Sequence, residues 1–325
     1  MLKMVQEEKK WYDNFTGILA QKFPKKQDLV QELMDLLYIE REAVYRRLRQ
    51  DVIFTAHEVI KIAAEWNISL DDIVNENSCT VSFKMRKINY ISPTDEDLAF
   101  LRKVINGINA TKDYPSTEFM DICNKLPRQF LAGFPRLNQF YLFKWIYQYG
   151  NERDVVPYSR INISEEKTQL TAAYYQAIKS VPNTKFIFDR LLFDYLVSDI
   201  QYFTSIQLIS AEEKELIKKD LTDLLDYLLE IAKRGCYPET KNKVGLYVSH
   251  LHVDTNYNYV YAAEANICFV NVFEKFEIFS FNPEMVENFR TWMNLKKRSS
   301  IQISEVDERS RIEYFSRQRE LIEKL

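Results

Sequence analysis

The stretch 33–50, LMDLLYIEREAVYRRLRQ, constrains the fold more than any other part of this 325-residue sequence. It predicts two short helices separated by a tight turn near Tyr38, with four arginines crowded onto the second helix. Val44 and Leu48 are four residues apart, so they mark one buried stripe of that helix. Its other faces carry mostly charged residues. The pattern is typical of a helix-turn-helix whose second helix can enter the DNA major groove.

The flanking sequence predicts a compact all-helical unit around this stretch. Five helices are expected, over residues 4–22, 27–37, 41–49, 56–67 and from Ser69 onward. Thr55 is followed by Glu58 at the spacing of a capping box, which predicts the start of the fourth helix. The side chain of Ser69 can cap the fifth.

The segment LMDLLYIEREAVYRRLRQ, followed by TAHEVIKIAAEWNISLDDIV, resembles the helix-turn-helix of phage-repressor-type (lambda-repressor-like) regulators. The run A-V-Y-R-R-L-R resembles the BetR-type variant, and the resemblance covers residues 27–74. The family usually has a small residue at Met34, glycine at Tyr38 and often glycine at Gln50. Either Tyr38 adopts a left-handed backbone, which is costly for a bulky residue, or the turn here differs slightly.

Direct readout of DNA needs side chains at the exposed N-terminal end of the recognition helix, here about residues 40–50. The candidate DNA-binding residues are Glu40, Arg41, Glu42, Tyr45, Arg46 and Arg49. Arg41 could pair with a guanine, Glu42 with a cytosine, and Tyr45 with a thymine methyl group or a phosphate. Arg46 and Arg49 are expected to contact phosphates. The alternative is that the arginines form a solvated helix face, and the two glutamates repel phosphate.

The sequence predicts a mainly α protein in three parts. Residues 1–78 form the helix-turn-helix domain, 79–92 a linker, and 93–325 a region for dimerisation or effector sensing. That region is expected to be helical over 93–240 and α+β over 241–325, with a small antiparallel β-sheet plus helices. The block F-P-x-L-x-x-F-x-x-F-x-W and the closing run E-R-x-R-I-x-Y-F-x-R-Q-R resemble the long region behind such helix-turn-helix domains in regulators of gut anaerobes.

Composition narrows the functional classes. Hydrophobic residues make up 46% and charged residues 28%, a globular balance, and the net charge of −3 means that DNA must be attracted by a local patch. The absence of a long apolar run and of a signal-peptide pattern predicts a cytoplasmic protein with no membrane contact. Four scattered cysteines without a C-x-x-C pair indicate buried, reduced thiols.

His250 and His252, with Asp254, form the only metal-like cluster in the sequence. An H-x-H on a strand places both imidazoles on one face, but the exposed face of any sheet has the same pattern, and no third ligand is evident. No Ser-His-Asp order, glycine-rich phosphate loop or H-E-x-x-H occurs. We therefore expect no enzyme activity, metal or cofactor.

The aromatic residues between Phe130 and Phe203 fit either a helical core or the lining of an effector pocket. The resulting hypothesis is a cytoplasmic transcriptional regulator that binds double-stranded DNA as a homodimer and responds to a small-molecule or protein effector. The alternative is a protein-interaction module that uses the helix-turn-helix fold as a scaffold without binding DNA.

Overall fold

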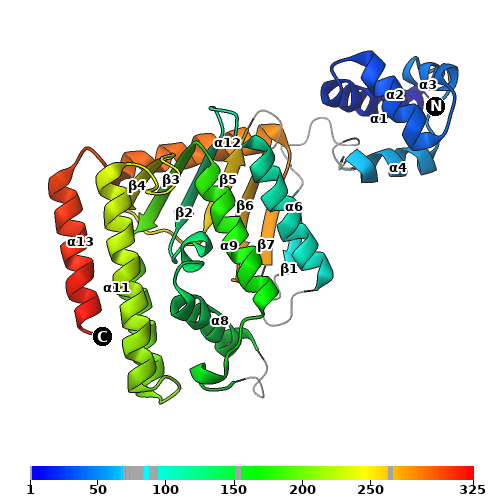
Figure 1. The fold of residues 1–325 in the computed structure, drawn as a ribbon. Helices are drawn as coiled ribbons and strands as arrows, with labels where there is room; N and C mark the ends of the chain where they lie inside the picture. Colours follow the sequence, from blue (N-terminus) through cyan, green and yellow to red (C-terminus); the bar gives the residue numbers. More distant parts are fainter. Residues whose placement is uncertain are drawn as a thin grey trace. The chain divides into compact units, whose positions relative to one another are not determined.

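The chain divides into two compact units, Met1–Ser82 and Phe83–Leu325, in the computed structural model (Figure 1). The structure describes residues 2–66, 68, 70, 73, 83–87, 94–150, 155–262, 266–274 and 276–325, and side chains only from residue 11 onward. Each unit has its own apolar core. Within the described ranges, none of the helices has the length and apolar character needed to cross a membrane.

The N-terminal unit is helical throughout its described elements. These are α1 (Leu2–Lys22), α2 (Lys26–Leu37), α3 (Arg41–Leu48) and α4 (Ala56–Trp66). The predicted capping box of α4 is confirmed, because the Thr55 amide donates to the Glu58 carboxylate at 2.8 Å and the Glu58 amide donates to the Thr55 hydroxyl at 3.3 Å. Ser69, the expected cap of a fifth helix, lies outside the described residues.

An eight-stranded mixed sheet organises the C-terminal unit, in the order β1-β7-β6-β5-β2-β3-β4-β8. Its strands are β1 (Lys84–Lys87), β2 (Glu118–Cys123), β3 (Asn183–Asp189), β4 (Lys243–Ser249), β5 (Tyr257–Tyr261), β6 (Ile267–Val272), β7 (Phe276–Ser280) and β8 (Ser300–Gln302). β2, β3 and β4 pair in parallel, and all other neighbours are antiparallel.

The expected fold class is therefore wrong for the C-terminal unit. Residues 93–240 are not purely helical, since they contain β2 and β3, and the sheet is large and mixed instead of small and antiparallel. Every residue of β2 is buried, as are the last four residues of β3. Parallel strands covered on both faces are continuously apolar, so the segments FMDIC and KFIFD lack the alternation that reveals a strand.

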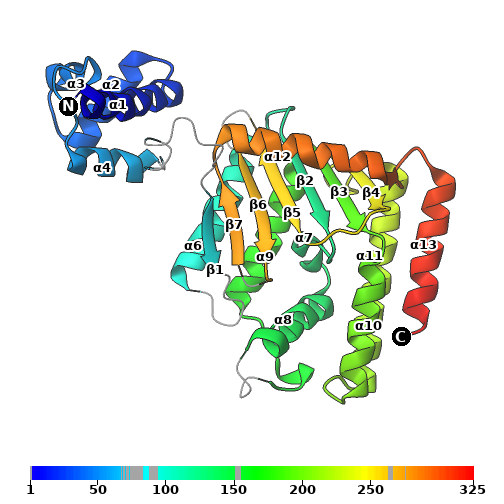
Figure 2. The same ribbon diagram turned by 180° about the vertical axis from the view of Figure 1, so that it is seen from behind.

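Helices cover both faces of this sheet. One face packs against α6 (Asp95–Thr111), α7 (Arg128–Leu131), α8 (Pro135–Tyr149), α9 (Glu165–Ser180), α10 (Leu192–Ser205), α11 (Ala211–Arg234) and α13 (Glu308–Glu323). The other packs against α12 (Pro283–Lys296), which crosses the strands in Figure 2. Successive residues of β2 alternate between the two cores: Phe119 faces the larger helical layer and Met120 faces α12.

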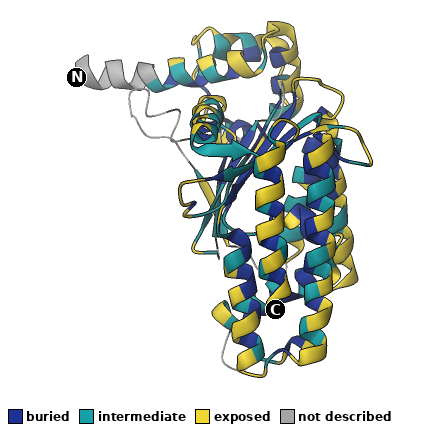
Figure 3. Cartoon of the chain, turned by 90° about the vertical axis from the view of Figure 1, so that its left-hand side faces the viewer, coloured by how far each residue is buried: buried dark blue, intermediate teal, exposed yellow. Residues whose placement is uncertain are grey.

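Local capping signals mark the ends of helices in this unit. Ser210 caps the start of α11, and Gly235 ends it with a left-handed backbone. Thr94 caps α6 in the same way. Residues 84–87, within the expected linker 79–92, form the edge strand β1. In Figure 3, the long helices that cover the sheet have buried residues on one side and exposed residues on the other, which is the pattern of one-sided packing.

Candidate nucleic-acid interface

The turn between α2 and α3 has a left-handed residue at its start. Tyr38 ends α2 with φ 56° and ψ 43°, and its amide donates to the Met34 carbonyl at 2.9 Å. Of the two alternatives that the sequence leaves open, the left-handed backbone is the one observed. Gln50, after α3, also has a positive φ of 65°. Both positions where the resembled family carries glycine thus have the backbone that glycine favours.

The apolar stripe of α3 fixes which side of this helix faces solvent. Val44 is fully buried and Leu48 is half-buried against the N-terminal core, as the four-residue spacing predicts. Glu40 is the residue before the first turn, without a side-chain capping hydrogen bond. The outer surface therefore carries the side chains of Arg41, Glu42 and Arg46.

Arg47 points inward and ties α3 to α4. Its Nη2 donates to Glu58 Oε1 at 2.8 Å and its Nε donates to Oε2 at 3.1 Å, with both side chains at most 15% exposed. Burial alone would raise the pKa of Glu58, but hydrogen bonds from Arg47 and from the Thr55 amide outweigh it and lower that pKa. The sequence pattern did not indicate this role of Arg47. The signal was the capping spacing of Glu58, which places a carboxylate beside α3.

Arg49 is held in an exposed charge cluster. It donates to Glu42 at 2.9 Å and to Asp51 at 3.1 Å. Hydrogen bonds to these carboxylates raise the pKa of Arg49 above its ordinary value. Two of the candidate contact residues, Glu42 and Arg49, therefore pair with each other. Their contacts to DNA would require this surface ion pair to open, which costs little.

Arg41 and Arg46 differ from their neighbours. Both side chains are exposed, and in the described part of the chain neither has an ion pair. Tyr45 lies between them, half-buried, with the Lys26 ammonium 5.7 Å from its ring centre. Guanidinium groups without a protein partner are available to phosphate oxygens or base edges.

The start of α2 adds a second cationic position. Lys25 and Lys26 are exposed there, and the residue before the helix, Lys25, provides no side-chain cap. The amides of a first helical turn and the helix dipole favour an anion at such an end. Since the Lys26 ammonium also approaches the Tyr45 ring, the start of α2 lies beside α3.

The histidine pair lies beyond the strand on which the sequence pattern placed it. β4 ends at Ser249, so His250 and His252 follow the strand and do not share one of its faces. His252 Nδ1 lies 3.1 Å from Asp189, whereas His250 lines a separate cavity. Across the described ranges, no group of three or more His, Cys, Asp or Glu side chains could hold a metal ion.

No protein-family model matches this chain, and no curated protein or solved structure matches it either. Arguments about function therefore depend on the geometry described above.

Proposed function

We propose that this protein is a sequence-specific, DNA-binding transcriptional regulator. α3 enters the major groove, and residues 83–325 serve dimerisation or signal sensing. One observation carries the proposal: α3 directs one arginine inward to a largely buried carboxylate and leaves two, Arg41 and Arg46, exposed and without an ion pair among the described residues. A helix that served only as a scaffold would not need two exposed arginines beside an inward-facing one.

The roles of the side chains follow from their positions on α3. Arg41 is the first residue of the helix and can reach a guanine edge, worth about 1–3 kcal/mol of discrimination. Arg46 lies about one turn further along α3, and its positive charge attracts the phosphate backbone of DNA. Lys25 and Lys26 contribute in the same way. Glu40 and Glu42 repel phosphate, which weakens nonspecific binding and leaves base contacts to decide affinity.

Salt dependence of DNA binding tests the proposal. Fluorescence anisotropy with a random-sequence duplex should give a log affinity that falls linearly with log salt concentration. Arg46→Ala should reduce the slope by about one, because one phosphate contact is lost. Arg160→Ala is the matched control, since Arg160 is an exposed arginine of the C-terminal unit, and it should leave the slope unchanged.

Selection of bound duplexes from a random pool then tests specificity. An enriched palindrome with half-sites about one helical turn apart is the expected result for a homodimer. Absent binding, or a flat salt dependence for both the wild type and Arg46→Ala, would contradict the proposal and favour the protein-interaction module.

A further inference from the structure

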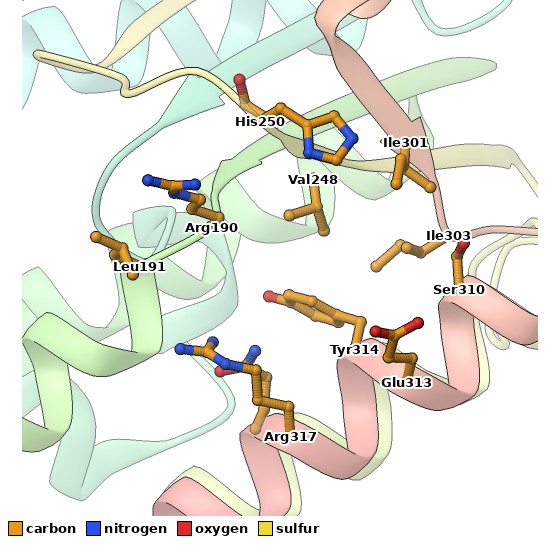
Figure 4. Close-up of a pocket in the computed structure, with 12 residues that line it drawn as sticks. Arg190, Leu191, Val248, His250, Ile301, Ile303, Ser310, Glu313, Tyr314 and Arg317 are labelled. Carbon is orange, nitrogen blue, oxygen red and sulfur yellow. The ribbon is translucent and has the colours of Figure 1, made fainter.

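A cavity of about 400 Å³ lies at the carboxyl ends of β3 and β4, under α13. The two strands are parallel neighbours whose last residues, Asp189 and Ser249, are paired, so the residues that follow them lie at the same edge of the sheet. Arg190 and His250 are those residues, and both line the cavity (Figure 4). The carboxyl edge of parallel strands is where such sheets bind ligands.

The walls of the cavity are largely apolar. Val248 of β4, Ile301 of β8 and Ile303 contribute aliphatic side chains, and the Tyr314 ring extends among them in Figure 4. A space of this size, with apolar walls and a few polar groups, suits a small organic molecule, since such sites span about 300–1,000 Å³.

Arg190 supplies an uncompensated positive charge at this cavity. The carboxylate next to it in sequence, Asp189, is already engaged: it accepts from the amides of Leu191 and Val253 at 2.8 Å each and lies 3.1 Å from His252. The Arg190 side chain is exposed, and it forms no ion pair with any of the described residues. The guanidinium therefore keeps its capacity to bind an anion.

Gln318 gives an independent indication of a polar ligand. It lines the same cavity from α13, is fully buried, and has no hydrogen-bond partner for either its amide nitrogen or its amide oxygen. Buried polar groups are normally satisfied, and leaving one unmet is costly. Arg317, one residue earlier, pairs with only one oxygen of Asp194, while the other oxygen is buried without a partner.

We infer that this cavity binds a small organic acid with an apolar or aromatic body and one carboxylate or phosphate group. The acidic group lies against Arg190, the body contacts Val248, Ile301 and Tyr314, and Gln318 donates its unmet amide hydrogens. Glu313 lines the opposite side of the cavity in Figure 4, and its exposed carboxylate orients the anionic end toward Arg190. The site is independent of DNA binding by α3.

Titration calorimetry on the full chain with benzoate, phenyl phosphate, benzamide and inorganic phosphate tests this inference. Benzoate or phenyl phosphate should bind with a Kd below about 1 mM, and whichever binds more tightly identifies the acidic group. Benzamide lacks the charge and inorganic phosphate lacks the body, so both should bind at least about tenfold more weakly.

Three variants locate the site. Arg190→Gln should weaken the binding of the aromatic acid by about tenfold or more, and Arg160→Gln, at an exposed arginine elsewhere in the unit, should leave it unchanged. Gln318→Leu should raise the thermal unfolding midpoint of the ligand-free protein and weaken the binding of the aromatic acid several-fold. A gain in stability with unaltered affinity would overturn the role of Gln318.

The whole inference is overturned if neither acid binds at about 5 mM, if benzamide binds as tightly as benzoate, or if the Arg190→Gln and Arg160→Gln variants bind the acid with equal affinity.

Discussion

The two units treat buried polar groups in opposite ways. In the N-terminal unit, the largely buried guanidinium of Arg47 is engaged by Glu58 and by the Ala43 carbonyl, and no buried side-chain N or O atom among the described residues of this unit lacks a partner. In the C-terminal unit, Asp121, Asp194, Arg311 and Gln318 each keep at least one buried polar atom without a hydrogen bond. Among the described residues of the first unit, polar side-chain atoms without a protein partner therefore lie at the surface. In the second unit, some of these atoms are buried, where a bound ligand or a proton can satisfy them.

A large effect is expected from breaking the largely buried ion pair of the N-terminal unit. Arg47→Ala leaves the largely buried Glu58 carboxylate without its partner, which should cost about 3 kcal/mol. Hydrogen exchange of the full chain should show the protection of amides in α3 and α4 falling by about 100-fold. Arg49→Ala removes only exposed ion pairs, with Glu42 and Asp51, and should change this protection by less than about threefold. Equal effects of the two variants would contradict the inward role of Arg47.

The next effect concerns the buried, half-satisfied acid of the C-terminal unit. Burial raises the pKa of Asp121 to about 7, although a hydrogen bond from Gln129 opposes the rise. The folded protein thus holds a proton that the unfolded chain releases near pH 4, so stability should fall as the pH rises from about 4 to 7 and level off above.

Asp121→Asn should remove this pH dependence and stabilise the protein at pH 8 by about 2–4 kcal/mol. Urea denaturation monitored by circular dichroism at pH 5 and pH 8 measures both quantities. Asp113→Asn, at an exposed aspartate, is the control and should leave the pH dependence intact. A wild-type unfolding midpoint that does not fall between pH 5 and pH 8 would show that Asp121 is ionised in the folded state.

The smallest expected effect concerns the backbone of the N-terminal unit, because the left-handed residue Tyr38 carries a conformational cost there. Tyr38 is 86% exposed and left-handed, so Tyr38→Gly should stabilise the turn by about 0.5–1 kcal/mol even though the ring's contact with Lys61 is lost. Gln31→Gly, inside α2, should have the opposite sign, because glycine costs about 1 kcal/mol in a helix interior. Hydrogen exchange in α2 and α3 compares the two variants, and destabilisation by both would contradict the prediction.

Signals that act within a few residues predict features of α3 and α4 in the N-terminal unit. The Val44–Leu48 spacing and the Thr55–Glu58 capping box depend only on near neighbours in sequence, and both are observed. β2 and β3 could not be predicted in this way, because the burial of both faces removes the alternation of a strand.

The same difference explains what was predictable about the candidate sites. Arg41 and Arg46 of the proposed DNA-binding surface lie within one short helix, so the sequence alone brings these two residues together. Arg190 and His250 are adjacent only because β3 and β4 pair in parallel, and a segment read as a helix could not reveal that neighbourhood. Gln318 comes from a third, distant element, and only the packed structure shows that its amide is unsatisfied.

The two ends of the sheet bear on how copies of this chain can associate. β1 carries two lysines and an arginine within four residues, and β8 is only three residues long. Charged or very short edge strands disfavour the joining of sheets between molecules. Growth of the sheet into aggregates is thus disfavoured at both edges, and we expect any dimer of this protein to form through surfaces other than the sheet edges.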